Sequence, residues 1–131
     1  MVDEIQIELV SPEKKIASTT AASIILPGME GDMMALPNHS TFLTSLRPGI
    51  LTINATDGVH EYVITGGFAE ISGLTTTVLA ERAIPKEEIT KEFLNALIIE
   101  AEEEYGTADG QRKSGAGLRL NDILKLDELF G

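Results

Sequence analysis

The chain has 131 residues, no cysteine and a formal net charge of −11. This length fits one compact domain with a small appendage, and the lack of cysteine excludes disulfides, thiolate metal sites and cysteine catalysis. The acidic balance argues against binding to nucleic acid or to anionic lipid, and no apolar run approaches the roughly 20 residues that a membrane span needs.

Residues 5–80 carry the pattern of short β-strands separated by tight turns. Apolar side chains alternate with polar ones from Ile5 to Leu9, and β-branched residues follow one another from Thr75 to Val78, as strands favour. Pro-Gly and Gly-Gly pairs interrupt the apolar runs, and Asp57-Gly58 between two alternating runs indicates a hairpin. This series of short strands predicts a β-sandwich or a barrel.

The pattern changes at Pro85, which suits the first turn of a helix. Apolar residues recur every four positions from Ile89 to Ala101, and acidic residues cover the other side. Such a stripe is typical of a helix that buries one face.

The next segment, residues 106–117, contains four glycines. Each glycine costs a helix about 1 kcal/mol relative to alanine, so a flexible connection is expected there. A short amphipathic segment follows, with Asn121 as a candidate N-cap. The predicted fold is mainly β plus α, with a β-sandwich domain over residues 1–85 and a helical hairpin with a short second helix over residues 86–131.

Few residues could carry catalysis. His39 lies beside Ser40, but adjacent residues rarely align as base and nucleophile, and the sequence context of a hydrolase serine is missing. His60 lies within an alternating strand and is expected at the surface. The glycine-rich stretch 27–32 lacks the ligand spacing of a calcium loop and the lysine of a phosphate loop. We therefore predict an interaction module that is not an enzyme, with no catalytic residue, cofactor or metal.

Six short motifs follow one another along the chain. They are Leu9-Val10-Ser11-Pro12-Glu13, Leu26-Pro27-Gly28-Met29-Glu30-Gly31-Asp32, Leu36-Pro37-Asn38-His39, Leu43-Thr44-Ser45-Leu46-Arg47-Pro48-Gly49, Thr65-Gly66-Gly67-Phe68-Ala69-Glu70-Ile71 and Val78-Leu79-Ala80-Glu81-Arg82-Ala83. Together they resemble the epsilon subunit of F-type ATP synthases, the equivalent of the mitochondrial delta subunit. The motifs occur in the family's order across two-thirds of the chain, which makes the match specific, and the remaining helical third resembles the family only in forming a hairpin.

The resemblance implies a sandwich of about ten strands followed by two helices. It implies a non-catalytic rotor subunit of the central stalk, which binds the gamma subunit and the ring of c subunits and couples proton-driven rotation to ATP synthesis. It also allows contact between the hairpin and the alpha and beta catalytic subunits. The implied location is peripheral, on the cytoplasmic side of the inner membrane, or on the matrix side in an organelle.

The resemblance also implies where the c-ring contacts lie, namely in two loops at the end of the sandwich that faces the ring. Glycines there let the backbone approach closely, and carboxylates can pair with basic residues on polar c-subunit loops. The gamma contact is expected on a sheet face. The implied c-ring contacts are Glu30, Gly31, Asp32 and Met33 in the first loop, and Asn38 and His39 in the second.

Two departures from the family concern regulation. Inhibitory hairpins of bacterial relatives are rich in Ala, Lys and Arg, whereas this chain has 4 acids and 4 bases after Tyr105, so we expect weak or absent inhibition of ATP hydrolysis. Relatives that bind ATP carry Asp and Arg near the first helix. Here Thr90 and Phe93 occupy those positions, which leaves phosphate without its cation, so weak ATP binding at best is expected.

Two rival functions remain. A free β-sandwich that binds peptides or glycans is the first, and it would present an exposed aromatic-rich face. Aromatic residues make up 5% of the chain and tryptophan is absent, which argues against a glycan platform. An enzyme is the second, and it would show a deep pocket with perturbed titratable groups.

Overall fold

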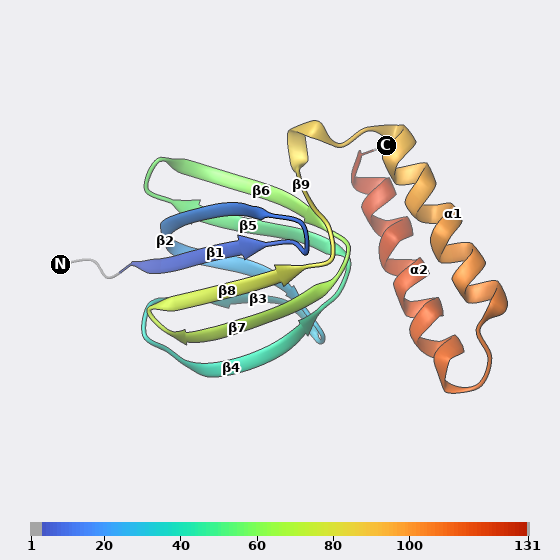
Figure 1. The fold of residues 1–131 in the computed structure, drawn as a ribbon, viewed down its shortest axis with the longest axis horizontal. Coiled ribbons are helices and arrows are strands. Elements are labelled where there is room, and N and C mark those ends of the chain that lie inside the picture. Colours follow the sequence, from blue (N-terminus) through green and yellow to red (C-terminus); the bar gives the residue numbers. More distant parts are fainter. Residues whose placement is uncertain (1–3, 131) are drawn as a thin grey trace. The chain divides into compact units, whose positions relative to one another are not determined.

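The computed structural model describes residues 4–130 and divides the chain into two compact units between Lys86 and Glu87. The sequence placed this boundary after residue 85. Figure 1 shows the strands of the first unit and the helices of the second. The described part of the first unit contains nine strands, which are β1 (Ile5–Val10), β2 (Lys15–Gly28), β3 (Gly31–Ala35), β4 (His39–Leu46), β5 (Gly49–Ala55), β6 (Gly58–Ile64), β7 (Gly67–Gly73), β8 (Thr75–Ala80) and β9 (Ala83–Pro85).

The strands form a sandwich of two sheets that share β2. The first half of this 14-residue strand pairs with β1, and its second half pairs with β3 and β5. The first sheet runs β2, β1, β8, β7, β4, and the second runs β3, β2, β5, β6, β9. Counting β2 once in each sheet reconciles the nine observed strands with the predicted number of about ten.

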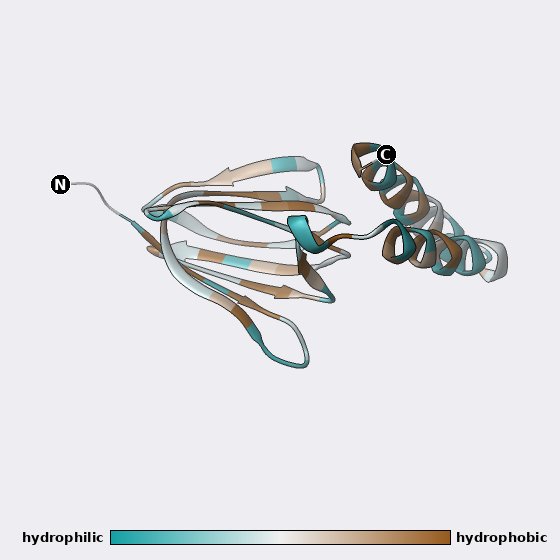
Figure 2. Cartoon of the chain, turned by 90° about the horizontal axis from the view of Figure 1, so that it is seen from above, coloured by the Kyte–Doolittle hydropathy of each residue, from teal (hydrophilic) through white to brown (hydrophobic). Residues whose placement is uncertain are grey.

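Alternating side chains build the core between the sheets. Ile5, Ile7 and Leu9 of β1 are at most 1% exposed, because every second residue of a strand points to the same face. Apolar residues of the other strands join them in one cluster, and Figure 2 shows the apolar residues along both sheets. The β5–β6 hairpin turns at Thr56 and Asp57, so the predicted turn pair, Asp57-Gly58, is displaced by one residue.

The second unit is where the structure differs most from the sequence prediction. After a 3-10 turn (Lys86–Glu88), α1 spans Lys91–Thr107 and α2 spans Gln111–Phe130. The second helix has 20 residues and is not short. The predicted connection over residues 106–117 is wrong, because only residues 108–110 separate the helices.

Packing between the helices explains why the glycines do not prevent α2. A Cβ atom on Gly117 would lie 3.1 Å from Cε1 of Tyr105, so this glycine makes room for the aromatic ring. Lys113 contacts the same residue in two ways. Its Nζ lies 4.3 Å from the centroid of the Tyr105 ring, and it donates a hydrogen bond to the Tyr105 carbonyl oxygen at 3.1 Å. Tertiary contacts therefore outweigh the weak helix propensity of this segment.

The helix ends also differ from expectation. Pro85 lies in β9, and α1 begins six residues later with Thr90 as its N-cap. The Thr90 hydroxyl oxygen accepts a hydrogen bond from the Phe93 N–H at 3.1 Å, as a helix start requires. Asn121, the predicted cap of the second helix, lies inside α2.

Candidate interaction surfaces

The first loop predicted to contact the c-ring is a tight turn between β2 and β3. Gly28 pairs with Gly31, which leaves Met29 and Glu30 at the tip. Gly31 has a φ of 122°, a backbone angle that residues with a side chain rarely adopt. Arg47 stabilises the turn, since its guanidinium donates a hydrogen bond to the Met29 carbonyl oxygen at 3.2 Å. The turn therefore has a defined shape.

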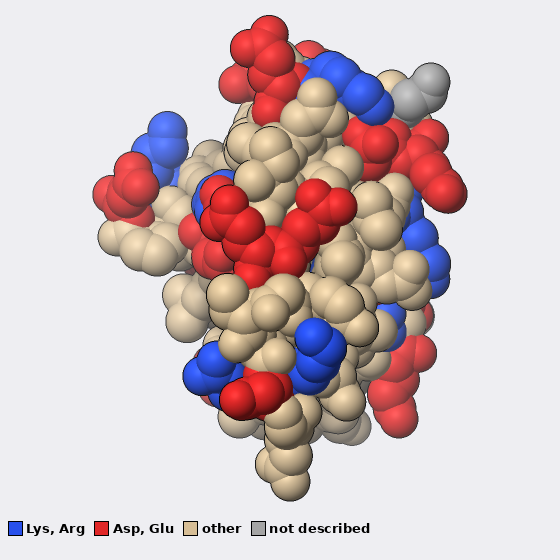
Figure 3. Space-filling model, turned by 90° about the vertical axis from the view of Figure 1, so that its right-hand side faces the viewer, with Lys and Arg blue, Asp and Glu red and all other residues tan. Residues whose placement is uncertain are grey.

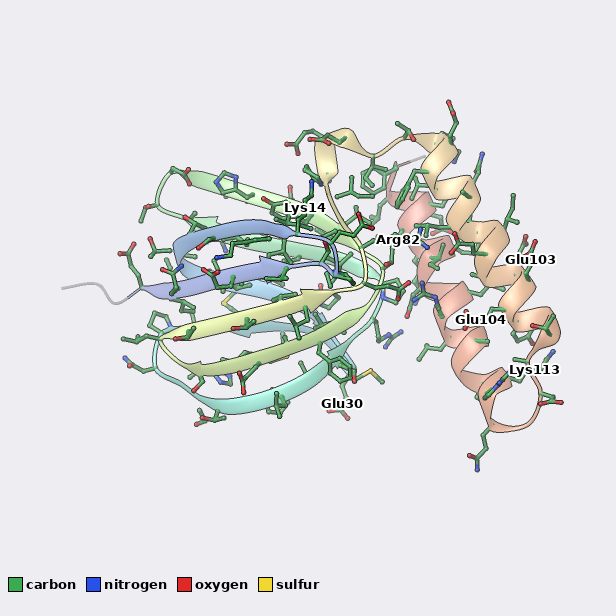
Figure 4. The ribbon with its side chains drawn as sticks, in the orientation of Figure 1. Lys14, Glu30, Arg82, Glu103, Glu104 and Lys113 are labelled. Atoms are coloured by element: carbon green, nitrogen blue, oxygen red, sulfur yellow. The ribbon has the colours of Figure 1, made fainter. Side chains whose placement is uncertain are left out.

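This turn presents a mixed acidic and apolar surface. Glu30 and Asp32 are exposed, and Met29 is half-exposed. Figure 4 shows Glu30 at the edge of the sandwich, pointing away from the strands. A hollow of about 500 Å³ adjoins the turn, lined by Gly28, Met29, Glu30, Gly31, Asp32, Met33, Phe42 and Thr44. Four predicted residues, Glu30, Gly31, Asp32 and Met33, thus lie together.

The second predicted loop lies elsewhere. Asn38 adopts a φ of 66° and donates its N–H to the Gly73 carbonyl at 3.0 Å. Nδ1 of His39 lies 2.6 Å from the Ser40 carbonyl oxygen. These contacts fit the interpretation that His39 serves its loop and not catalysis.

Strand register separates the two loops. At one end of β4, Leu46 pairs with Gly28 beside the first loop, and at the other end His39 pairs with Gly73. Seven residue steps along a strand span about 23 Å. The expectation that both loops share one end of the sandwich is therefore wrong, and Asn38 and His39 do not join the surface around Glu30.

The outward face of the first sheet carries a surface that the sequence analysis left unassigned. Val10 of β1 is opposite Leu79 of β8, which is opposite Phe68 of β7. Leu43 of β4 follows in the next row, opposite Glu70. Leu43, Phe68 and Leu79 are 68%, 60% and 54% exposed. We call Val10, Leu43, Phe68 and Leu79 the apolar outer face.

A groove follows this face at one end of the sheet. Its volume is about 660 Å³, and its lining is Val10, Ser11, Pro12, Gly67, Phe68, Leu79, Ala80 and Glu81. The sequence did carry a signal for it, because Phe68 and Leu79 occupy outward positions of β7 and β8, where the other outward residues, such as Glu70 and Thr77, are polar. A groove with exposed aromatic and aliphatic walls can take an apolar side chain from a partner.

The surface of the hairpin is charged. Glu100, Glu102, Glu103 and Glu104 of α1 are all exposed, and Figure 3 shows acidic groups in patches separated by uncharged surface. One cross-helix ion pair joins Lys91 Nζ to Asp127 Oδ1 at 2.8 Å. At the two positions that distinguish ATP-binding relatives, Thr90 caps α1 and Phe93 packs against the hairpin core.

Other titratable groups make local contacts. Nε2 of His60 lies 2.8 Å from Oδ1 of Asp57, and this hydrogen bond lowers the pKa of Asp57. Within residues 4–130, no three His, Cys, Asp or Glu side chains gather as they would around a metal ion. No helix in that range is long and apolar enough to cross a membrane.

Comparisons with known proteins give the family. Residues 4–86 match the family model described as ATP synthase, Delta/Epsilon chain, beta-sandwich domain. The ATP synthase epsilon chain of Ruegeria sp. is 52% identical over 108 residues, covering 82% of this chain and 79% of the relative. The chain from Jannaschia sp. is 42% identical over 127 residues and 96% of each chain.

Solved structures agree with these relatives. A chain in the Euglena gracilis mitochondrial ATP synthase, in a structure described as OSCP/F1/c-ring, matches with a TM-score of 0.75 and 27% identity. The match covers 98% of this chain and 82% of that one. A chain in the central stalk/c-ring structure of the Tetrahymena thermophila enzyme shares the fold, with a TM-score of 0.65 and 18% identity. The chain therefore belongs to the ATP synthase delta/epsilon family, as an epsilon subunit of the F-type enzyme.

Proposed function

We propose that this chain is a rotor subunit of the central stalk that binds the gamma subunit and the c-ring. Epsilon chains are non-catalytic subunits of the synthase, so the work of this chain is to hold partners and transmit rotation to catalytic sites elsewhere. The observation that carries the proposal is the apolar outer face. Such a face on one sheet of a closed sandwich is suited to burial against a permanent partner.

The gamma subunit is the partner that we assign to the apolar outer face. Phe68 and Leu79 flank the groove of about 660 Å³, and large anchors beside a hollow are typical of the energetic centre of an interface. The rows that follow on one side carry the hydroxyl groups of Thr77, Thr75 and Ser72, which suit a polar rim.

The c-ring is the partner that we assign to the β2–β3 turn. Glu30 and Asp32 can pair with basic groups on the polar loops of the ring, which fixes orientation more than affinity. Met29 and Met33 add flexible apolar contacts that adapt to the partner's shape. Of the six residues implied by the resemblance, we retain the four in this turn. Asn38 and His39 lie at the other end of β4 and are assigned no c-ring contact.

A binding experiment with purified gamma subunit tests the function. The wild-type chain is expected to co-elute with gamma as a one-to-one complex on size exclusion. Leu79→Asp should weaken the complex by about 100-fold, because it places a charge in the apolar contact. Val59→Asp is the matched control, since Val59 is 63% exposed on the outer face of the second sheet. Absence of any wild-type complex would contradict the proposal.

Cross-linking in the assembled synthase tests the c-ring contact. The chain has no cysteine, so Glu30→Cys and His39→Cys each introduce one thiol at a known place. With cysteines in the polar loops of the c subunit, only Glu30→Cys is expected to form a disulfide-linked product under mild oxidation. A product from His39→Cys alone would reverse the assignment.

The hairpin is expected to inhibit ATP hydrolysis weakly or not at all. The 4 acids and 4 bases after Tyr105 leave no net positive charge to attract an acidic loop of a catalytic subunit. The second helix is 20 residues long, so the prediction depends on charge and not on a missing helix. Deleting residues 87–131 from the assembled enzyme should change its ATPase rate by less than about twofold. Strong activation would refute it.

The complex would keep the chain peripheral to the inner membrane, on the cytoplasmic side in a bacterium or the matrix side in an organelle. The alternative function, a stand-alone β-sandwich binding module, would use the same apolar outer face for a peptide. It predicts that the chain fractionates away from the synthase. Recovery of the chain with membranes through the assembled enzyme would exclude that alternative.

A further inference from the structure

The outer face of the first sheet carries two carboxylates in one row. Across the sheet, Ser18 is opposite Glu8, Glu8 is opposite Thr77, and Thr77 is opposite Glu70. Leu43 closes the row beyond Glu70. The two glutamates thus share a sheet, a face and a strand level, and they differ in what surrounds them.

Glu8 already has its partners within the chain. Ser18 and Gln6 donate hydrogen bonds to its Oε2, the latter at 3.0 Å, and Lys15 Nζ lies 2.9 Å from its Oε1. The hydrogen bonds from Ser18, Lys15 and Gln6 lower the pKa of Glu8 to about 2. This carboxylate therefore stays ionised with its charge compensated locally.

Glu70 has no such partner. It is exposed, and no hydrogen bond or ion pair joins its carboxylate to another side chain within residues 4–130. The residue opposite Glu70 on the adjacent strand β4 is Leu43, and Phe68 lies two residues away from Glu70 on the same face of β7. Glu70 is therefore an uncompensated negative charge beside the apolar outer face.

A partner that covers Leu43 and Phe68 must also remove water from Glu70. Burying a carboxylate without a partner is unfavourable and would oppose the association. A positive group from the partner turns this cost into a specific contact, because a charged pair made on binding fixes register and rejects wrong partners.

We propose that the gamma subunit places a lysine or arginine side chain over Glu70. This inference rests on the proposed docking of gamma at the apolar outer face, and it adds the recognition element that the apolar residues lack. The cation sits between Leu43 and Thr77 and within reach of the Glu70 oxygens. Glu8 needs no partner cation, because Lys15 already occupies that role.

The experiment compares Glu70→Gln with Glu8→Gln for binding to purified gamma at about 50 mM and about 300 mM NaCl. Both changes keep side-chain shape and remove one negative charge. Glu70→Gln is expected to weaken binding by about tenfold or more at low salt and to flatten the salt dependence of the association rate. Glu70→Lys should weaken binding further. Glu8→Gln should bind like the wild type.

Each outcome separates this inference from the proposed function. If the wild type does not bind gamma, the proposed function fails and the inference falls with it. If the wild type binds and Glu70→Gln matches it in affinity and salt dependence, the inference is overturned while gamma binding stands. Equal losses in Glu70→Gln and Glu8→Gln would indicate a general charge effect and would also overturn it. Thermal unfolding of each variant checks that folding is unchanged.

Discussion

Replacing Gly67 by alanine is expected to destabilise the sandwich by about 3 kcal/mol or more. A Cβ atom at this position would lie 2.1 Å from the Leu79 carbonyl oxygen and 3.0 Å from the Ala80 Cα, both of them backbone atoms of β8. The backbone of Gly67 also has a φ of 148°. Since backbone cannot rotate aside as a side chain can, β7 and β8 would have to separate where their pairing begins.

Gly58→Ala is the matched control for this prediction. Gly58 has a φ of 134°, and a Cβ there would meet nothing within 4 Å. Its substitution therefore adds strain without a clash and should cost about 1 to 2 kcal/mol. Urea unfolding of both variants, followed by far-ultraviolet circular dichroism, measures the two free energies of unfolding. Equal losses would show that the close approach of β7 to β8 contributes nothing.

Replacing Ile123 by alanine is expected to unfold the hairpin and leave the sandwich folded. Ile123, Leu97 and Ala101 are at most 2% exposed and form the buried cluster between α1 and α2. Truncating one large side chain in a buried core costs about 2 to 5 kcal/mol. This cluster in the hairpin is small, whereas the sandwich has a separate and larger one, so the loss is expected to fall on the hairpin.

Residue-resolved amide hydrogen exchange tests that expectation. Amides of α1 and α2 should lose protection in Ile123→Ala, and those of the sandwich strands should keep it. Leu129→Ala serves as the control, because Leu129 is 69% exposed and its truncation removes little buried surface. Equal loss of protection in strands and helices would mean that the two units unfold together.

The sequence predicted the sandwich because strand alternation is a local signal. Ile5, Ile7 and Leu9 could be assigned to the core from their spacing alone. The sharing of β2 between two sheets could not be predicted, because pairing partners are set by distant strands and nothing in residues 15–28 marks where the partner changes. The hairpin was misjudged because Gly117 looks like a helix breaker until the ring of Tyr105 is placed beside it.

The candidate site was predicted in part for a related reason. The family resemblance placed the loops around Glu30 and Asn38 at the same end of the sandwich. β3 lies between them and carries the chain away by about 3.3 Å per residue. The apolar outer face was missed because its members come from four strands. Only their register brings Val10, Leu79, Phe68 and Leu43 together.

The parallel pairing of β1 with β8 also affects how the chain is made. Residues 6–10 leave the ribosome well before residues 75–79, with which they pair. Local hairpins such as β5–β6 can form as they emerge, whereas the first sheet cannot be completed before β8 emerges, and such distant contacts form slowly. Until then, β1 keeps an unpaired edge that can associate with another nascent chain. The period of greatest aggregation risk for this protein therefore falls during translation and ends when β8 is released.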